Sequence, residues 1–146
     1  MSVLFHIPQV FTPELLRLMM EMGHGEELLI CDANFPYRST GCQQSNIIHI
    51  PGCTVAALLE KVLEFFPLDQ SVNSAAVVME SAKESDTFDK FSMLLRAAPY
   101  PTVLETVPRF PFYDRAKKAV GVVVTSDMVK GGNILIKKGV VRDESV

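Results

Sequence analysis

The chain has 146 residues, of which 48% are hydrophobic, as expected for one domain with enough apolar side chains to form a core. Its formal net charge of -3 excludes the strongly positive surface that binds nucleic acid, and its apolar runs are well short of the roughly 20 residues that cross a bilayer. The N-terminus also lacks the layout of a signal peptide. We therefore expect a single domain over residues 1–146, located in the cytoplasm, with neither nucleic-acid nor membrane partners.

The first predicted elements are a helix and a buried strand. Thr12 can cap a helix that begins at Pro13 and carries apolar residues on one face, and Gly23 can end it. The continuous apolar run over residues 28–31 predicts a strand covered on both faces, with Cys31 buried. A polar loop is expected over residues 38–44. Cys31, Cys42 and Cys53 show no CxxC spacing, which favours reduced thiols over a disulfide framework or a zinc site.

The rest of the chain alternates between strand and helix. Strands are expected over residues 46–50, 75–79, 103–107, 120–125 and 133–137, and helices over residues 54–66, 86–97 and 111–119. This order predicts an α/β domain of three layers, in which helices flank a largely parallel sheet. Such sheets bind ligands beyond the carboxyl ends of their strands, and Asp32 follows one of these ends.

The stretch Gly23-His24-Gly25 is the first candidate site. It does not match a phosphate-binding loop, because the third glycine is absent and the motif follows a helix rather than a strand. Two interpretations of His24 remain. Its imidazole can act as a general acid or base near neutral pH, made accessible by the flanking glycines, or it can simply lie in a helix-to-strand turn without a chemical role.

Asp32 also has two interpretations. An ionised carboxylate at this strand end could accept hydrogen bonds from substrate hydroxyls, or orient His24 by accepting its other ring proton. Alternatively, Asp32 stabilises the turn that precedes Pro36, which is a common use of aspartate.

Two later segments supply further polar candidates. Arg109 can bridge adjacent hydroxyls with its fork of donors, and Tyr113 can stack on a sugar or donate through its hydroxyl; a surface ion pair and core packing are the alternatives. Gly131 and Gly132 permit close backbone approach to a ligand and Asn133 offers a donor and an acceptor, although an ordinary turn also explains these three residues.

Four stretches in this order, PELL, EMGHGEELLICDANFP, RFPFYDRAKKA and GNILIKKG, resemble the RbsD/FucU family of L-fucose mutarotases and D-ribose pyranases, and the fucose branch most. The resemblance covers nearly the whole chain and implies an RbsD-like fold. It implies a sugar mutarotase that interconverts anomers without metal or cofactor. His24 would be the catalytic acid/base, Asp32 and Arg109 would bind the sugar, and the segment from Gly131 to Asn133 would complete the pocket.

The same resemblance implies a homodecamer of two stacked pentameric rings, in which each active site takes residues from neighbouring chains. The fucose enzymes typically have Tyr-Gly-Asn where this chain has Gly131, Gly132 and Asn133, so one sugar-contacting tyrosine is missing and Tyr113 could partly compensate. This difference leaves an alternative open, namely a catalytically silent sugar-binding or regulatory module of the same fold. Since a strand separates His24 from Asp32, the two residues of one chain could serve different pockets.

Overall fold

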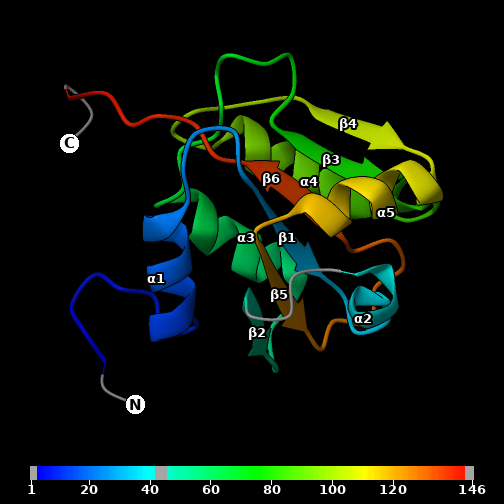
Figure 1. Ribbon diagram of the computed structural model, residues 1–146, viewed down its shortest axis with the longest axis horizontal. Helices are drawn as coiled ribbons and strands as arrows, with labels where there is room; N and C mark the ends of the chain where they lie inside the picture. Colours follow the sequence, from blue (N-terminus) through cyan, green and yellow to red (C-terminus); the bar gives the residue numbers. More distant parts are fainter. Residues whose placement is uncertain (1–2, 42–45, 144–146) are drawn as a thin grey trace.

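The computed structural model describes residues 3–41 and 46–143, so Cys42 and the end of the predicted polar loop lie outside the described residues. Its centre is a six-stranded sheet with the strand order β2-β5-β1-β6-β3-β4 (Figure 1). The strands are β1 (Glu27–Cys31), β2 (Ile47–Ile50), β3 (Ala76–Met79), β4 (Leu104–Val107), β5 (Gly121–Thr125) and β6 (Ile134–Lys137). Five of the six strands fall within the segments predicted from sequence, and β1 begins one residue before its predicted segment, at Glu27.

Five of these strands run in the same direction, which confirms the largely parallel sheet. β1 pairs in parallel with β5, β5 with β2, and β3 with β4, whereas β6 is antiparallel to both β1 and β3. The antiparallel direction of β6 was not predicted from the sequence. The connection between β5 and β6 is shorter than the dozen or more residues that a parallel crossover needs, so the chain returns in the opposite direction.

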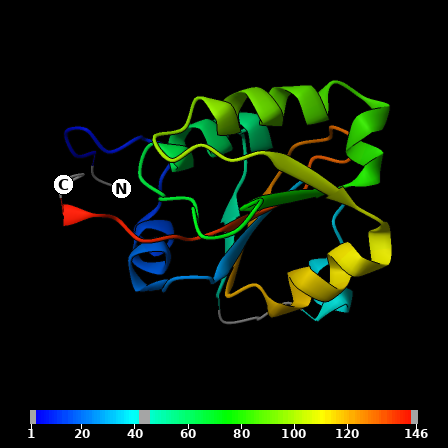
Figure 2. The same ribbon diagram turned by 90° about the horizontal axis from the view of Figure 1, so that it is seen from above.

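Helices cover both faces of the sheet and make a three-layer domain. The α-helices are α1 (Pro13–Glu21), α2 (Tyr37–Thr40), α3 (Val55–Leu63), α4 (Thr87–Arg96) and α5 (Arg109–Lys118), and a 3-10 helix, η2, spans Glu80–Glu84. Figure 2 shows α3 and α4 on one side of the sheet and α2 and α5 on the other. No helix within residues 3–41 and 46–143 has both the length and the apolar character to cross a membrane.

β1 is buried from both sides because successive side chains point to opposite faces of the sheet. Leu28 and Ile30 belong to the core formed with α1, α3 and α4, and Leu29 and Cys31 to the core formed with α5. All four side chains are fully buried, which confirms the doubly covered strand predicted from the apolar run. Burying one such aliphatic side chain contributes about 1.5–3 kcal/mol, so the burial of β1 stabilises the centre of the sheet.

Two helices were not predicted, and two others differ by more than one residue from the predicted bounds: α3 ends at Leu63 rather than at residue 66, and α5 begins at Arg109. The hydroxyl of Thr12 accepts a hydrogen bond of 3.1 Å from the Leu15 amide, as its predicted capping role requires. In contrast, α2 and η2 were not predicted, because helices of one turn carry no detectable hydrophobic period. The predicted loop therefore begins as helix α2. Helix α5 begins at Arg109, ahead of Pro111, because proline is tolerated throughout the first turn of a helix.

Candidate functional site

The residues predicted to form the site lie at opposite ends of β1. His24 precedes the strand, and Asp32 follows it. A five-residue strand that rises about 3.3 Å per residue separates its ends by on the order of 15 Å, which is too far for one monosaccharide to contact both side chains. Within one chain the structure thus contains two separate groups, which we call the His24 end and the Asp32 end.

The His24 end is built on the turn between α1 and β1. Gly25 has a φ of 85°, a conformation that favours glycine, and its amide donates to the Lys138 carbonyl at 2.8 Å. On the other side of the histidine, the Gly23 amide donates to the Glu26 carboxylate at 3.1 Å. These contacts hold the backbone of the turn while leaving the His24 side chain 51% exposed, so its imidazole is accessible to a ligand.

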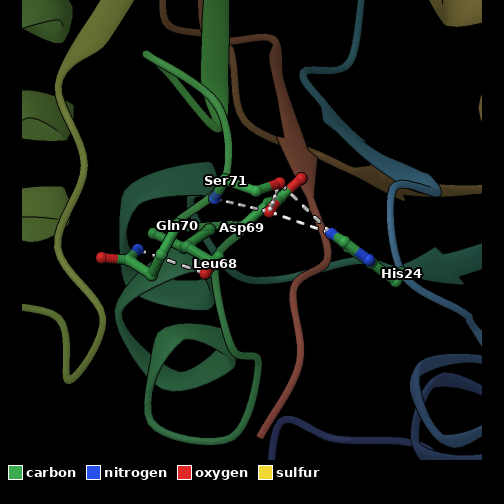
Figure 3. A network of polar contacts seen from close by, with 5 residues as sticks. All are labelled: His24, Leu68, Asp69, Gln70 and Ser71. Atoms are coloured by element: carbon green, nitrogen blue, oxygen red, sulfur yellow. Dashed lines mark hydrogen bonds and ion pairs between the residues drawn. The ribbon is translucent and has the colours of Figure 1, made fainter.

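The His24 imidazole points toward a second loop, which precedes β3 (Figure 3). Its Nε2 lies 3.1 Å from Oδ1 of Asp69, whose side chain is only 4% exposed. The same carboxylate oxygen accepts hydrogen bonds from the Ser71 hydroxyl at 2.7 Å and the Ser71 amide at 2.9 Å. Ser71 therefore holds the carboxylate, and the carboxylate holds the imidazole.

These hydrogen bonds determine which ring nitrogen of His24 is basic. Burial raises the pKa of the Asp69 carboxyl, but the hydrogen bonds from Ser71 and then from His24 outweigh burial and bring the pKa below its ordinary value. Asp69 is thus ionised at neutral pH and can only accept. In the neutral ring, Nε2 must carry the proton donated to Asp69, and Nδ1 bears the lone pair that can take a proton from a substrate.

The three residues do not form the triad of a serine hydrolase. In such a triad the serine and the aspartate contact opposite nitrogens of the histidine, so that the ring can accept the proton of the serine. Here the Ser71 hydroxyl lies 3.4 Å from Nε2, the nitrogen that contacts Asp69. Ser71 is consequently a partner of Asp69 rather than a nucleophile.

A cavity of about 440 Å³ opens beside this network, within the size range of small-molecule sites. The cavity is lined by His24, Asp69, Gln70, Ser71, Tyr100, Val140 and Arg142. Both its histidine and its ionised carboxylate come from loops, and the loops are attached to the sheet. Among the described residues, no group of three or more His, Cys, Asp and Glu side chains could hold a metal ion.

The Asp32 end brings together Asp32, Gly132 and Asn133. The Asp32 amide donates to the Asn133 side-chain oxygen at 2.8 Å, and the Asn34 amide donates to Asp32 Oδ1 at 2.9 Å. Burial raises the pKa of the Asp32 carboxyl, and hydrogen bonds from Asn34, Gly132, Asn133 and Phe35 only partly offset this effect. The contact with Asn34 confirms the turn-stabilising role of Asp32, whose side chain is buried at this end of the sheet.

The two glycines at this end occupy positions with little room for a side chain. Gly131 has a φ of 71°, and a Cβ built on it would lie 2.8 Å from the Ala82 amide nitrogen in η2. A Cβ on Gly132 would lie 2.5 Å from the Val129 side chain. Gly131 thus packs closely on η2 and Gly132 on the preceding loop, and their close approach to a ligand stays a prediction.

The structure brings Tyr113 to the Asp32 end but does not place Arg109 there. The Tyr113 ring packs edge-to-face on Phe35, with the ring centroids 5.5 Å apart. Arg109 is exposed at the start of α5, which follows β4, and β6 and β3 lie between β4 and β1 in the sheet. Core packing, the alternative for Tyr113, therefore matches the single chain, whereas the surface ion pair of the exposed Arg109 stays a prediction.

One hypothesis drawn from the sequence is wrong within one chain. Asp32 does not orient His24, because the length of β1 separates them; Asp69 occupies that role instead. Sequence reasoning missed both Asp69 and Ser71, which are 45 and 47 residues from His24. The available signal was local: an aspartate two residues before a serine, in a loop entering a strand, often accepts backbone hydrogen bonds in a turn.

Comparison with known proteins shows which family the chain as a whole matches. The model of the RbsD / FucU transport protein family matches residues 6–141. The chain is 41% identical to a fucose mutarotase of Danio rerio, covering 99% of this chain and 98% of that protein, and 42% identical to a fucose mutarotase of Mus musculus, covering 95% of each. A crystal structure of the fucose mutarotase of Streptococcus pneumoniae in complex with L-fucose superposes with a TM-score of 0.85, at 32% identity over 95% of this chain and 100% of that chain.

Proposed function

This chain belongs to the RbsD/FucU family, and on that premise we propose that it is a mutarotase that interconverts the α and β anomers of L-fucose or a closely related monosaccharide. The observation that carries the proposal is the pairing of the exposed His24 with the ionised, buried Asp69 beside a cavity large enough for a monosaccharide. The full-length similarity to fucose mutarotases supports L-fucose as the first sugar to test.

Mutarotation requires the hemiacetal ring to open and to close on the other face of C1. In the opening step, Nδ1 of His24 takes the proton of the C1 hydroxyl, the C1–O5 bond breaks, and O5 receives a proton. The resulting aldehyde rotates about the C1–C2 bond, and reclosure reverses both proton transfers. One histidine and a water relay can serve both positions, and such transfers typically contribute about 10²- to 10⁴-fold.

Asp69 makes His24 suitable for this reaction in two ways. As an acceptor for Nε2–H it fixes the ring tautomer, so that the basic nitrogen faces away from the carboxylate. As a negative charge it stabilises the imidazolium that forms when Nδ1 accepts the sugar proton. Neither a metal ion nor a cofactor is needed, because the uncatalysed reaction already proceeds in water and requires only acid/base assistance and positioning.

We further propose that a complete site combines the His24 end of one subunit with the Asp32 end of another. The separation of the two ends along β1 supports this arrangement, since Asp32, Asn133 and Tyr113 cannot reach a sugar bound at His24 in the same chain. Self-association, with the decamer of two pentameric rings as the expected form, would then be a condition of activity. Arg109, which is exposed in the single chain, would acquire its sugar-binding role only in the assembly.

Saturation transfer between the anomeric proton signals tests the activity directly. Irradiation of one anomer of L-fucose should reduce the signal of the other anomer far more with the protein present than in buffer. D-ribose and D-galactose, measured in the same way, define the substrate range. Exchange at the buffer rate for all three sugars would contradict the proposal.

A second candidate is a sugar-binding module without catalysis, which Gly131 favours because the tyrosine typical of the fucose enzymes is absent at that position. The same samples separate the two functions. Sugar-dependent broadening of ligand signals without faster anomer exchange would identify the binding module, whereas faster exchange would identify the enzyme.

A further inference from the structure

A single segment connects the two loops that carry His24 and Asp69. Residues 137–139, at the end of β6, lie between these loops and bond to both. On the His24 side, the Gly25 amide donates to the Lys138 carbonyl at 2.8 Å, and the Lys138 amide donates to the Glu26 carbonyl at 2.9 Å. The position of His24 is therefore tied to Lys138.

The same segment is bonded to the Asp69 loop. The Asp69 amide donates to the Lys137 carbonyl at 3.0 Å, and the Gly139 amide donates to the Pro67 carbonyl at 2.7 Å. The distance between the imidazole and the carboxylate thus depends on how closely each loop approaches this segment.

Gly139 determines how closely the Asp69 loop approaches residues 137–139. A Cβ built on Gly139 would lie 2.7 Å from the Asp69 Cα and 2.7 Å from the Leu68 carbonyl oxygen. Both neighbours are backbone atoms, so neither can swing aside as a flexible side chain would. Gly139 is not among the described glycines with positive φ, so its requirement for glycine comes from this contact rather than from backbone conformation.

The His24 side carries two further bonds, neither of which involves Gly139. Besides the two backbone bonds, the Lys138 ammonium group donates to the Met19 carbonyl at 3.0 Å and to the Met22 carbonyl, at the end of α1. A side chain at position 139 would therefore displace Leu68 and Asp69 while the His24 turn stays attached to Lys138.

We propose that Gly139 is a positioning residue of the active site: the absence of a side chain lets the Leu68–Asp69 backbone pack against the end of β6, which keeps the Asp69 carboxylate within hydrogen-bonding distance of His24. The inference rests on the proposed function only in giving the His24–Asp69 pair a catalytic role. Gly139 touches neither the sugar nor the reacting atoms, and it acts through Asp69.

The variant Gly139→Ala tests this inference. Since a displacement of about 1 Å near reacting groups can cost about 10²-fold in rate, we expect anomer exchange to slow by roughly that factor, with kcat affected more than KM. Imidazole ¹⁵N shifts should show His24 protonated at Nε2 in the wild type and a mixture of tautomers in the variant. This second readout needs no sugar, so it remains informative even if L-fucose proves not to be a substrate.

Gly52→Ala is the control. Gly52 lies outside both ends of β1, and no atom lies within 4 Å of a Cβ built at that position. This variant should keep the wild-type exchange rate and the wild-type ¹⁵N shifts. Wild-type values for both readouts in folded Gly139→Ala would overturn the inference.

Asp69→Glu changes the distance between the carboxylate and the His24 imidazole without adding an atom at Gly139. It is the variant to measure if Gly139→Ala fails to fold. The longer side chain keeps the negative charge but moves the carboxylate relative to the His24 imidazole, so slower anomer exchange is expected. In the double variant Gly139→Ala/Asp69→Glu, the extra methylene group should restore part of the rate lost in Gly139→Ala. An Asp69→Glu variant with the wild-type rate would show that the spacing does not matter.

Discussion

His24 Nε2 lies 3.1 Å from Asp69 Oδ1, although the two residues are 45 positions apart in the chain. The contact joins an accessible imidazole to a carboxylate that is almost completely buried. Burial makes the carboxylate a fixed partner, and exposure leaves the other ring nitrogen available to a ligand. A proton acceptor of defined orientation is the chemical outcome of this pairing.

Replacement of His24 should abolish most of the catalysis. We expect His24→Ala to slow anomer exchange by about 10²- to 10⁴-fold, because the variant loses the proton-transferring group. His49→Ala is the control, since His49 is exposed in β2 and its ring packs near Tyr37 instead of lining the cavity. Saturation transfer on L-fucose provides the measurement. Equal rates for the two variants would remove His24 from the mechanism.

The contribution of Asp69 to stability should depend on pH. Because folding lowers the pKa of the Asp69 carboxyl, its stabilising effect is present above the ordinary value of about 3.9 and is lost as the pH falls through the lower folded pKa. At pH 7, Asp69→Asn should reduce the free energy of unfolding by about 1–3 kcal/mol, with the difference from wild type shrinking below pH 4. Urea unfolding across this range tests the sign, and a difference that grows in acid would contradict it.

Mixing two inactive variants should restore activity if the site is shared between subunits. His24→Ala keeps an intact Asp32 end, and Asp32→Ala keeps an intact His24 end. When the two chains are co-expressed and assemble together, some sites combine both intact ends and should catalyse exchange. Each variant alone and the two purified proteins mixed without subunit exchange are the controls. Co-assembled but inactive oligomers would place the whole site within one chain.

Gly131 should tolerate substitution less well than another glycine with similar backbone conformation. Gly131 and Gly52 have φ values of 71° and 84°, so alanine is strained at both positions. A Cβ at Gly52 has no atom within 4 Å, whereas at Gly131 it meets the Ala82 backbone. We expect Gly52→Ala to cost about 1 kcal/mol and Gly131→Ala about 1–3 kcal/mol more. Thermal and urea unfolding measure both costs, and equal losses would show that η2 moves aside easily.

The fold was largely predictable from local patterns. The apolar run of β1, the Thr12 cap and the alternation of strands with helices depend on residues close together in sequence, and each was confirmed. The one-turn helix α2 and the antiparallel direction of β6 were not predicted. A single turn leaves no periodic signal, and the short connection before β6 implies an antiparallel strand only once β5 and β6 are known to lie in the same sheet.

For the candidate site, what the sequence determined and what the tertiary structure decided are more clearly separate than for the fold. The sequence by itself determined the family, the fold class and the location of His24 in a glycine-flanked turn, because short motifs and hydrophobic period record local requirements. Only the tertiary structure decided that Asp69 and Ser71 are the partners of His24, that Asp32 lies at the far end of β1, and that Gly139 lies against Asp69. These relationships depend on which loops the sheet brings together, and a contact between residues 45 positions apart leaves no trace in local spacing.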